Sequence, residues 1–146
     1  MKYLTTVVCL ISASVTHADL SPKLERYLLD RQMEFDQINA PRRAVLEPLA
    51  KALAGQLRDD NSTLDVTFVC THNSRRSHMS QLWMKAAAEN LQIPMTTWSG
   101  GTESTAMNPR AVASLRRAGF EINQTTKNSN PIYHVSMGTG TPTQTC

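Results

Sequence analysis

Hydrophobic residues recur at helical spacing in two stretches of the amino-terminal half of the chain. The first begins at Ser21, a hydroxyl cap that precedes a proline, and its pattern predicts a helix that continues to Ile38. A polar and proline-containing break at 39–41 follows. Helical spacing then resumes and predicts a second helix over 42–58, with a kink at Pro48.

The central part of the chain alternates between strand and helix patterns. Residues 64–69 are apolar and rich in β-branched side chains, which predicts a buried strand, and a polar loop at 71–74 follows it. Helical spacing over 77–91 and a second strand over 95–98 come next. Such a unit normally forms a right-handed parallel crossover. The polar loop is therefore expected at the carboxyl end of the first strand, where open α/β sheets bind ligands.

Regular patterning becomes weaker toward the carboxyl terminus. Asn108 and the following proline begin a helix that Gly119 terminates. Residues 120–122 fit a short strand or a docking segment, and 131–135 fit one further strand. The segment 136–146 consists largely of small and polar residues that bury little surface, and we expect a disordered tail there.

The first eighteen residues resemble an export signal. Lys2 precedes an apolar stretch, and small residues before Asp19 predict cleavage after Ala18. The alternative is a buried strand, since the stretch contains several β-branched residues. Export would place the protein in a periplasm or outside the cell, and otherwise it would be cytoplasmic. No later segment resembles a membrane span, so stable membrane insertion is not expected after cleavage.

These patterns give a domain organisation with one compact folded unit. We expect a signal peptide at 1–18, a helical amino-terminal extension at 19–60, an α/β domain at 64–135 and a disordered tail at 136–146. A length of 146 residues with 40% hydrophobic content suits a single core.

Charge and cysteine content exclude several functions. The formal net charge of +3 is too small to indicate a nucleic-acid-binding surface. The three cysteines, Cys9, Cys70 and Cys146, match neither a zinc-ligand spacing nor a paired disulfide framework. We therefore expect no metal site and no resident cofactor.

The strongest chemical signal is the loop that joins the first predicted strand to its helix. Cys70 and Arg76 lie six positions apart across it. Backbone N–H groups in such a loop converge on an anion, and the helix dipole adds positive potential that also lowers a cysteine pKa. Arg76 can then hold two oxygens of a tetrahedral anion while the Cys70 sulfur attacks its central atom.

The remaining loop residues would surround the same anion. Ser77 can donate a hydrogen bond to the Cys70 thiolate, and Asn73 tolerates a left-handed backbone. The expected oxyanion-binding residues are Thr71, His72, Asn73, Ser74, Arg75 and Ser77. In the alternative interpretation, Cys70 is a small buried hydrophobic residue, and the arginines are a solvated helix start.

Three stretches together resemble the low-molecular-weight protein tyrosine phosphatases and the thioredoxin-coupled arsenate reductases that share their fold. They are 66–79, with the loop above, 99–103, which resembles the second-strand motif, and 108–119, which resembles the next helix. The resemblance covers residues 64–135. It implies a three-layer parallel α/β sheet, here incomplete and extended by two amino-terminal helices.

The resemblance also implies chemistry. Cys70 would be the nucleophile and Arg76 the oxyanion clamp. The substrate would be a phosphate ester, phosphotyrosine or arsenate. A reductase would in addition need an external thiol or thioredoxin.

The sequence departs from the family pattern at several positions. His72 stands where the family usually has glycine, Arg75 replaces a common second cysteine, and His78 replaces the usual proline. The family's aspartate general acid has no counterpart, since no Asp or Glu follows Glu121. The general acid is therefore unknown, and the chain resembles a carboxyl-terminally truncated member.

The missing acid has a kinetic consequence for the expected activity. Loss of general acid catalysis lowers the rate on unactivated esters by about 100-fold to 10,000-fold. Cys146 is the only cysteine downstream of Cys70, and we interpret it as incidental rather than as a resolving thiol.

Three functions therefore remain. The first is a phosphomonoester hydrolase that acts through a thiophosphate on Cys70. The alternatives are an arsenate reductase that uses the same loop, and an inactive oxyanion-binding remnant.

Overall fold

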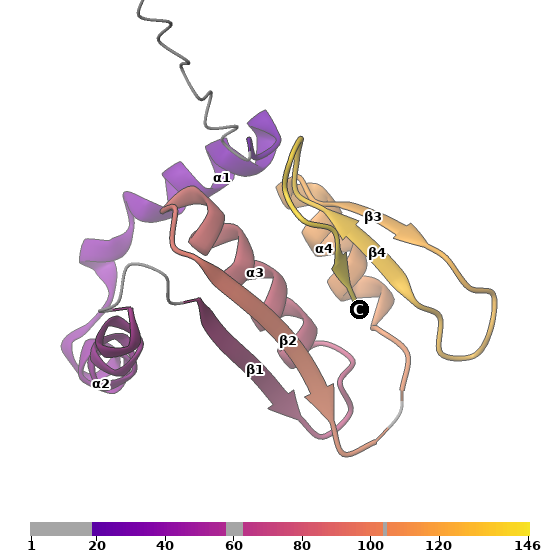
Figure 1. Ribbon diagram of the computed structural model, residues 1–146, viewed down its shortest axis with the longest axis horizontal. Coiled ribbons are helices and arrows are strands. Elements are labelled where there is room, and N and C mark those ends of the chain that lie inside the picture. The colour runs from indigo at the N-terminus through magenta and orange to yellow at the C-terminus, as the bar shows by residue number, and fades with distance from the viewer. Residues whose placement is uncertain (1–18, 58–62, 104) are drawn as a thin grey trace, which may run out of the picture.

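The computed structural model describes residues 19–57, 63–103 and 105–146, so the predicted signal peptide at 1–18 lies outside the described residues. The helices are α1 (Pro22–Gln32), the short 3₁₀ helix η1 (Phe35–Gln37), α2 (Ala40–Gln56), α3 (Arg76–Asn90) and α4 (Pro109–Ala118). The strands are β1 (Leu64–Cys70), β2 (Met95–Gly101), β3 (Glu121–Gln124), β4 (Tyr133–Ser136) and β5 (Gln144–Thr145) (Figure 1).

The predicted strand–helix–strand unit is confirmed. β1 and β2 pair in parallel, with a register that runs from Leu64 opposite Met95 to Cys70 opposite Gly101. α3 lies along one face of the pair (Figure 1). Because the strands are parallel, both carboxyl ends meet at one edge, and the segments that follow Cys70 and Gly101 become neighbours.

The rest of the sheet differs from the parallel arrangement of the expected fold. β3, β4 and β5 form a separate antiparallel sheet, with Ile122 opposite Val135 and Val135 opposite Gln144. The short connection between β3 and β4 returns the chain directly, which suits an antiparallel pair, whereas a parallel neighbour requires a longer crossover. The α/β class is thus confirmed, and the parallel sheet is incomplete.

The prediction of a disordered tail over 136–146 is wrong. Met137 is fully buried, and Gln144 in β5 pairs with β4. Tyr133 and Cys146 exchange backbone hydrogen bonds of 2.8 and 3.0 Å. The small and polar composition of residues 136–146 indicates only that their side chains bury little surface. An edge strand is held by backbone hydrogen bonds, which need no hydrophobic side chain.

The two amino-terminal helices are confirmed with changed boundaries. α1 ends at Gln32 instead of Ile38, because the chain tightens into η1 and the Arg43 guanidinium binds the carbonyl of Ile38 at 2.8 Å. α2 begins at Ala40 because the Asn39 side chain caps it, accepting a hydrogen bond of 3.0 Å from a backbone N–H of its first turn.

α1 is part of the main core, so the boundary expected near residue 60 does not separate it from the α/β domain. Leu24 is fully buried in the same cluster as residues of α3, α4 and β4. The backbone N–H of Ser21 donates to the Met137 carbonyl at 2.7 Å, and that of Asp19 donates to the Thr139 carbonyl at 3.0 Å. These bonds join α1 to the carboxyl-terminal segment.

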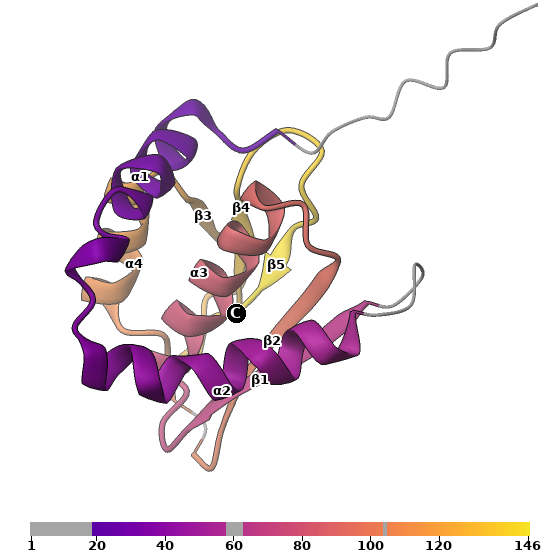
Figure 2. The same ribbon diagram turned by 90° about the vertical axis from the view of Figure 1, so that its left-hand side faces the viewer.

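α2 is held much more loosely. It crosses one side of the molecule (Figure 2) and has no buried residue. Leu53 of α2 and Leu57, its C-cap residue, pack against a small cluster of Leu64, Ala88 and Met95.

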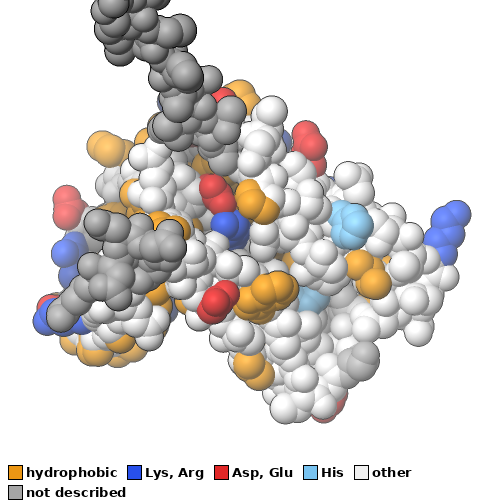
Figure 3. Space-filling view, viewed as in Figure 1, with side chains coloured by type: hydrophobic (Ala, Val, Ile, Leu, Met, Phe, Trp, Pro, Cys, Tyr) orange, Lys and Arg blue, Asp and Glu red, His pale blue; other side chains and the backbone are white. Residues whose placement is uncertain are grey.

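The sheet face opposite α3 is open. Val69 and Trp98 are exposed there, and hydrophobic side chains are scattered among polar ones on this side (Figure 3). Within the described ranges, no helix is long and apolar enough to cross a membrane.

Candidate functional site

The loop after β1 folds tightly against the end of β2. Asn73 has a positive φ of 42°, a left-handed conformation that asparagine tolerates better than most residues. Gly101 lies directly beneath it, and a Cβ at Gly101 would stand 2.7 Å from the Asn73 nitrogen and 2.9 Å from the Thr71 oxygen. A glycine at position 101 is therefore required for the loop to close over β2.

Cys70 ends β1 with its sulfur surrounded by hydrogen-bond donors. Its Sγ lies 3.0 Å from Ser77 Oγ. The Ser77 hydroxyl lowers the pKa of Cys70 most, and the backbone N–H groups of Ser77, Asn73 and Ser74 lower it further. Desolvation opposes them, and the pKa falls from 9.0 to about 7. About half of the Cys70 population is therefore thiolate at neutral pH.

The Ser77 hydroxyl links the thiol to the rest of the loop. Its oxygen also lies 2.7 Å from Asn73 Oδ1, to which it donates. A hydroxyl has one proton, so it can donate either to Asn73 or to the sulfur. Ionisation of Cys70 favours the second arrangement, because a thiolate is the stronger acceptor.

Cys70 and Arg76 line one small cavity of about 150 Å³. Its lining consists of Cys70, His72, Ser74, Arg75, Arg76, Thr105 and Asn108. Both arginines are exposed, and neither forms an ion pair within the described part of the chain. Their guanidinium groups are thus available to an anion, which fits the expected oxyanion site.

The segment after β2 forms the second wall of this cavity. Thr71 accepts a hydrogen bond of 2.9 Å from the Glu103 backbone N–H, and Ser74 accepts one of 2.8 Å from that of Asn108. The Thr105 hydroxyl donates to the His72 carbonyl. These bonds hold the expected oxyanion loop, residues 71–75, between the ends of the two parallel strands.

Thr105 and Glu103 are site residues that the sequence pattern did not predict. Glu103 belongs to the second-strand motif, which was expected only from a resemblance, and Asn108 was expected only as a helix cap. The signal that would have found them is the parallel crossover. Polar residues just after the second strand must lie beside those just after the first.

The two histidines near the loop occupy different environments. His72 is exposed, and its Nδ1 lies 2.6 Å from Glu103 Oε2. His78 is buried, and burial lowers its pKa. It faces a second cavity, of about 460 Å³, whose lining includes Asn73 and Cys146 but not Cys70. The structure therefore brings His72, but not His78, to the cavity that Cys70 and Arg76 line.

Cys146 does not have the properties of a reactive thiol. Burial raises its pKa to about 12, and its Sγ donates a weak hydrogen bond of 3.7 Å to Gln81 Oε1. It remains protonated at physiological pH and lines the second cavity rather than the first.

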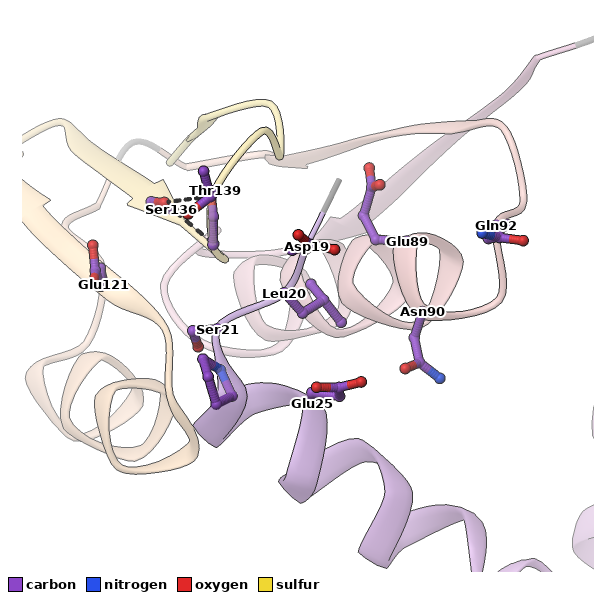
Figure 4. A pocket seen from close by; sticks show the side chains of 12 residues that line it. Asp19, Leu20, Ser21, Glu25, Glu89, Asn90, Gln92, Glu121, Ser136 and Thr139 are labelled. Carbon is purple, nitrogen blue, oxygen red and sulfur yellow. Dashed lines mark hydrogen bonds between the residues drawn. The ribbon is translucent and has the colours of Figure 1, made fainter. Parts of the chain in front are cut away.

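A larger hollow of about 820 Å³ lies between α1, the end of α3 and the β3–β4 sheet. Figure 4 shows the carboxylates of Asp19, Glu25, Glu89 and Glu121 around it. Among the residues that the structure describes, no basic side chain lines this hollow, so the described lining does not suit an oxyanion. No group of three or more metal-ligating side chains occurs among the described residues.

The architecture of the loop agrees with comparison to known proteins. The family model for low molecular weight phosphotyrosine protein phosphatases matches residues 65–137, half of the chain. The chain belongs to this family.

Individual relatives carry a different name. An arsenate reductase of Bacillus licheniformis is 38% identical over 61 residues, 42% of this chain and 42% of that protein. An arsenate reductase 2 of Staphylococcus haemolyticus is 34% identical over 64 residues, 43% and 46% of the two chains. The chain thus matches less than half the length of these relatives. No solved structure is significantly similar to it.

Proposed function

We propose that the protein is a thiol-dependent phosphomonoester hydrolase that forms a covalent thiophosphate on Cys70. One observation carries this proposal. The Cys70 sulfur has a pKa of about 7 and shares a cavity of about 150 Å³ with the guanidinium of Arg76, which forms no ion pair with the described residues. A thiolate nucleophile and a bidentate anion clamp are what phosphoryl transfer to sulfur needs.

The reaction would proceed in two displacements. The Cys70 thiolate attacks phosphorus, a sulfur–phosphorus bond forms, and the ester oxygen leaves. Water then attacks phosphorus, and Cys70 leaves again as a thiolate. In both steps, the guanidinium of Arg76 and the loop N–H groups hold the equatorial oxygens, whose charge grows in the transition state.

Pre-steady-state release of p-nitrophenol from p-nitrophenyl phosphate, under reducing conditions, tests this proposal. We expect a burst proportional to enzyme that Cys70→Ser abolishes. Arg76→Ala should slow it by about 100-fold to 1,000-fold, the usual cost of losing an oxyanion donor. Arg117→Ala is the matched control, because Arg117 is also exposed but lies on α4 away from the cavity. Folded protein without a burst contradicts the hydrolase.

Arsenate reduction is the second candidate, since the curated relatives above are named arsenate reductases. Arsenate would form an adduct with Cys70, and a second thiol would attack the sulfur. That attack gives a disulfide as arsenic(V) becomes arsenic(III). Cys146 is a poor second thiol, because its pKa is about 12. An external thiol or thioredoxin would therefore supply the second sulfur.

Arsenite production separates the candidates. A reductase consumes arsenate only when glutathione or reduced thioredoxin is added, and Cys146→Ser leaves its rate unchanged. A hydrolase turns over phosphate esters with a non-thiol reductant alone. Neither activity, combined with phosphate binding that Arg76→Ala removes, would identify an inactive oxyanion-binding remnant.

A further inference from the structure

We propose that His72 is the general acid and base of this site and that Glu103 positions it. The proposal rests on the hydrolase function proposed above and supplies the proton donor that has no counterpart in the sequence pattern. It comes from the junction between the oxyanion loop and the segment after β2. There, a titratable ring from one strand end meets a carboxylate from the other.

His72 has the right location for proton transfer. It lies two residues after Cys70 and lines the same cavity as the sulfur and Arg76. Its side chain is 57% exposed, so it stands at the mouth, where a leaving group would depart into solvent. Arg75, Arg76, Cys70 and Glu103 are the charged or titratable groups around it.

Glu103 fixes which ring nitrogen can exchange the proton. Its Oε2 lies 2.6 Å from Nδ1, so Nδ1–H donates to the carboxylate and Nε2 is the nitrogen that gains and loses a proton. Hydrogen bonds also hold the backbone near both residues of the pair. Glu103 N–H binds the Thr71 carbonyl at 2.9 Å, and the Thr105 hydroxyl binds the His72 carbonyl. The ring is therefore held by its neighbours on the chain and by its partner.

His72 transfers one proton in each of the two displacements. While the Cys70 sulfur forms its bond to phosphorus, Nε2–H of the imidazolium donates its proton to the departing ester oxygen, which leaves as an alcohol. In the second step, the neutral Nε2 takes a proton from the attacking water as the sulfur–phosphorus bond breaks. Cys70 is restored as a thiolate and His72 as an imidazolium. Throughout, the Glu103 carboxylate accepts the Nδ1–H and keeps Nε2 as the nitrogen that exchanges the proton.

A purely structural role for the His72–Glu103 pair predicts a different result from an acid–base role. If the pair only braced the loop, its loss would affect all substrates alike. An exposed ion pair contributes little to stability, so removal of the ring should leave the protein folded. The dependence on leaving group therefore separates the roles, because a poor leaving group needs the proton and a good one does not.

The experiment compares kcat/KM for phenyl phosphate and p-nitrophenyl phosphate in the full chain. His72→Asn is the informative variant, because its amide nitrogen can replace Nδ1 as donor to Glu103 but cannot transfer a proton. We expect kcat/KM for phenyl phosphate to fall by about 100-fold or more, and that for p-nitrophenyl phosphate to change only a few-fold. His134→Asn, an exposed histidine on β4, is the control and should change neither.

Glu103→Ala tests the positioning residue through the same comparison of leaving groups. The variant removes the carboxylate that holds Nδ1–H, so kcat/KM for phenyl phosphate should fall more than that for p-nitrophenyl phosphate. Glu103→Gln, whose amide oxygen can still accept from Nδ1–H, should restore part of the loss. Equal losses on both substrates in His72→Asn or in Glu103→Ala would overturn the acid–base role alone. No turnover of either ester by the unmodified chain would overturn the hydrolase and this role together.

Discussion

The acidity of Cys70 depends mainly on one neighbouring hydroxyl, which makes Ser77→Ala a decisive perturbation. The Ser77 hydroxyl lies 3.0 Å from the sulfur and is the largest influence in a fall of the pKa from 9.0 to about 7. The backbone donors remain in the variant. We therefore expect the pKa of Cys70 to rise by about one, which is a tenfold loss of thiolate at pH 6.

Alkylation by iodoacetamide measures this change, because only the thiolate reacts at a useful rate. The rate at the Cys70 peptide, followed by mass spectrometry from pH 5 to 9, should be about tenfold lower in Ser77→Ala at pH 6 and nearly equal at pH 9. Ser80→Ala, on the same helix, is the control. Superimposable profiles for the wild type and Ser77→Ala would refute the assigned role of the hydroxyl.

Three further predictions concern stability, each measured by denaturant or thermal unfolding. Gly101→Ala should destabilise the fold by about 1–3 kcal/mol through overpacking, while Gly100→Ala, whose Cβ would meet nothing within 4 Å, should not. His78 is neutral when buried, so stability should fall as the pH drops below about 6.5, at up to about 1.4 kcal/mol per pH unit, and His78→Leu should remove that slope. Met137→Ala should cost about 2–5 kcal/mol, and the exposed Thr143→Ala almost nothing.

The sign of the His78 prediction follows from linkage. Burial lowers the pKa of His78 in the folded state, so the unfolded chain binds the proton more tightly. Acidification therefore favours unfolding, and the effect disappears above the unfolded pKa of about 6.5. Stability of His78→Leu that still declines in parallel with that of the wild type through this range would assign the slope to other groups.

The parts of the fold that could be predicted are those fixed by local chemistry. A run of β-branched residues that ends at Cys70, followed by a polar turn and a helix pattern, determined the strand, the loop and the crossover. The caps at Ser21 and Asn108 marked helix starts, because each side chain binds a backbone N–H of its own first turn. The Asn39 cap was expected only as part of a break, and the second helix therefore starts two residues earlier than predicted.

Tertiary contacts between residues that are distant along the chain were harder to predict. Periodicity shows that α1 has an apolar face, but not that Leu24 packs among residues of α3, α4 and β4. The segments 120–122 and 131–135 were expected as strand candidates and overlap β3 and β4, but their antiparallel pairing was not predicted. β5 was missed because it consists of polar residues held by backbone bonds. The pairing of His72 with Glu103 joins positions 31 residues apart, and no local pattern connects them.

The junction between α1 and the carboxyl-terminal segment determines where the protein can be truncated and influences the order in which its parts fold. Ser21 Oγ binds the carbonyl of Gly119, 98 positions away, and a Cβ at Gly138 would stand 2.1 Å from the Asp19 oxygen. Contacts so distant along the chain form late, because a long loop must close before they contribute. A protein expressed without α1 would expose Met137 and its surroundings. The oxyanion loop is therefore best studied in the chain that retains its first helix, even though no residue of that helix touches the site.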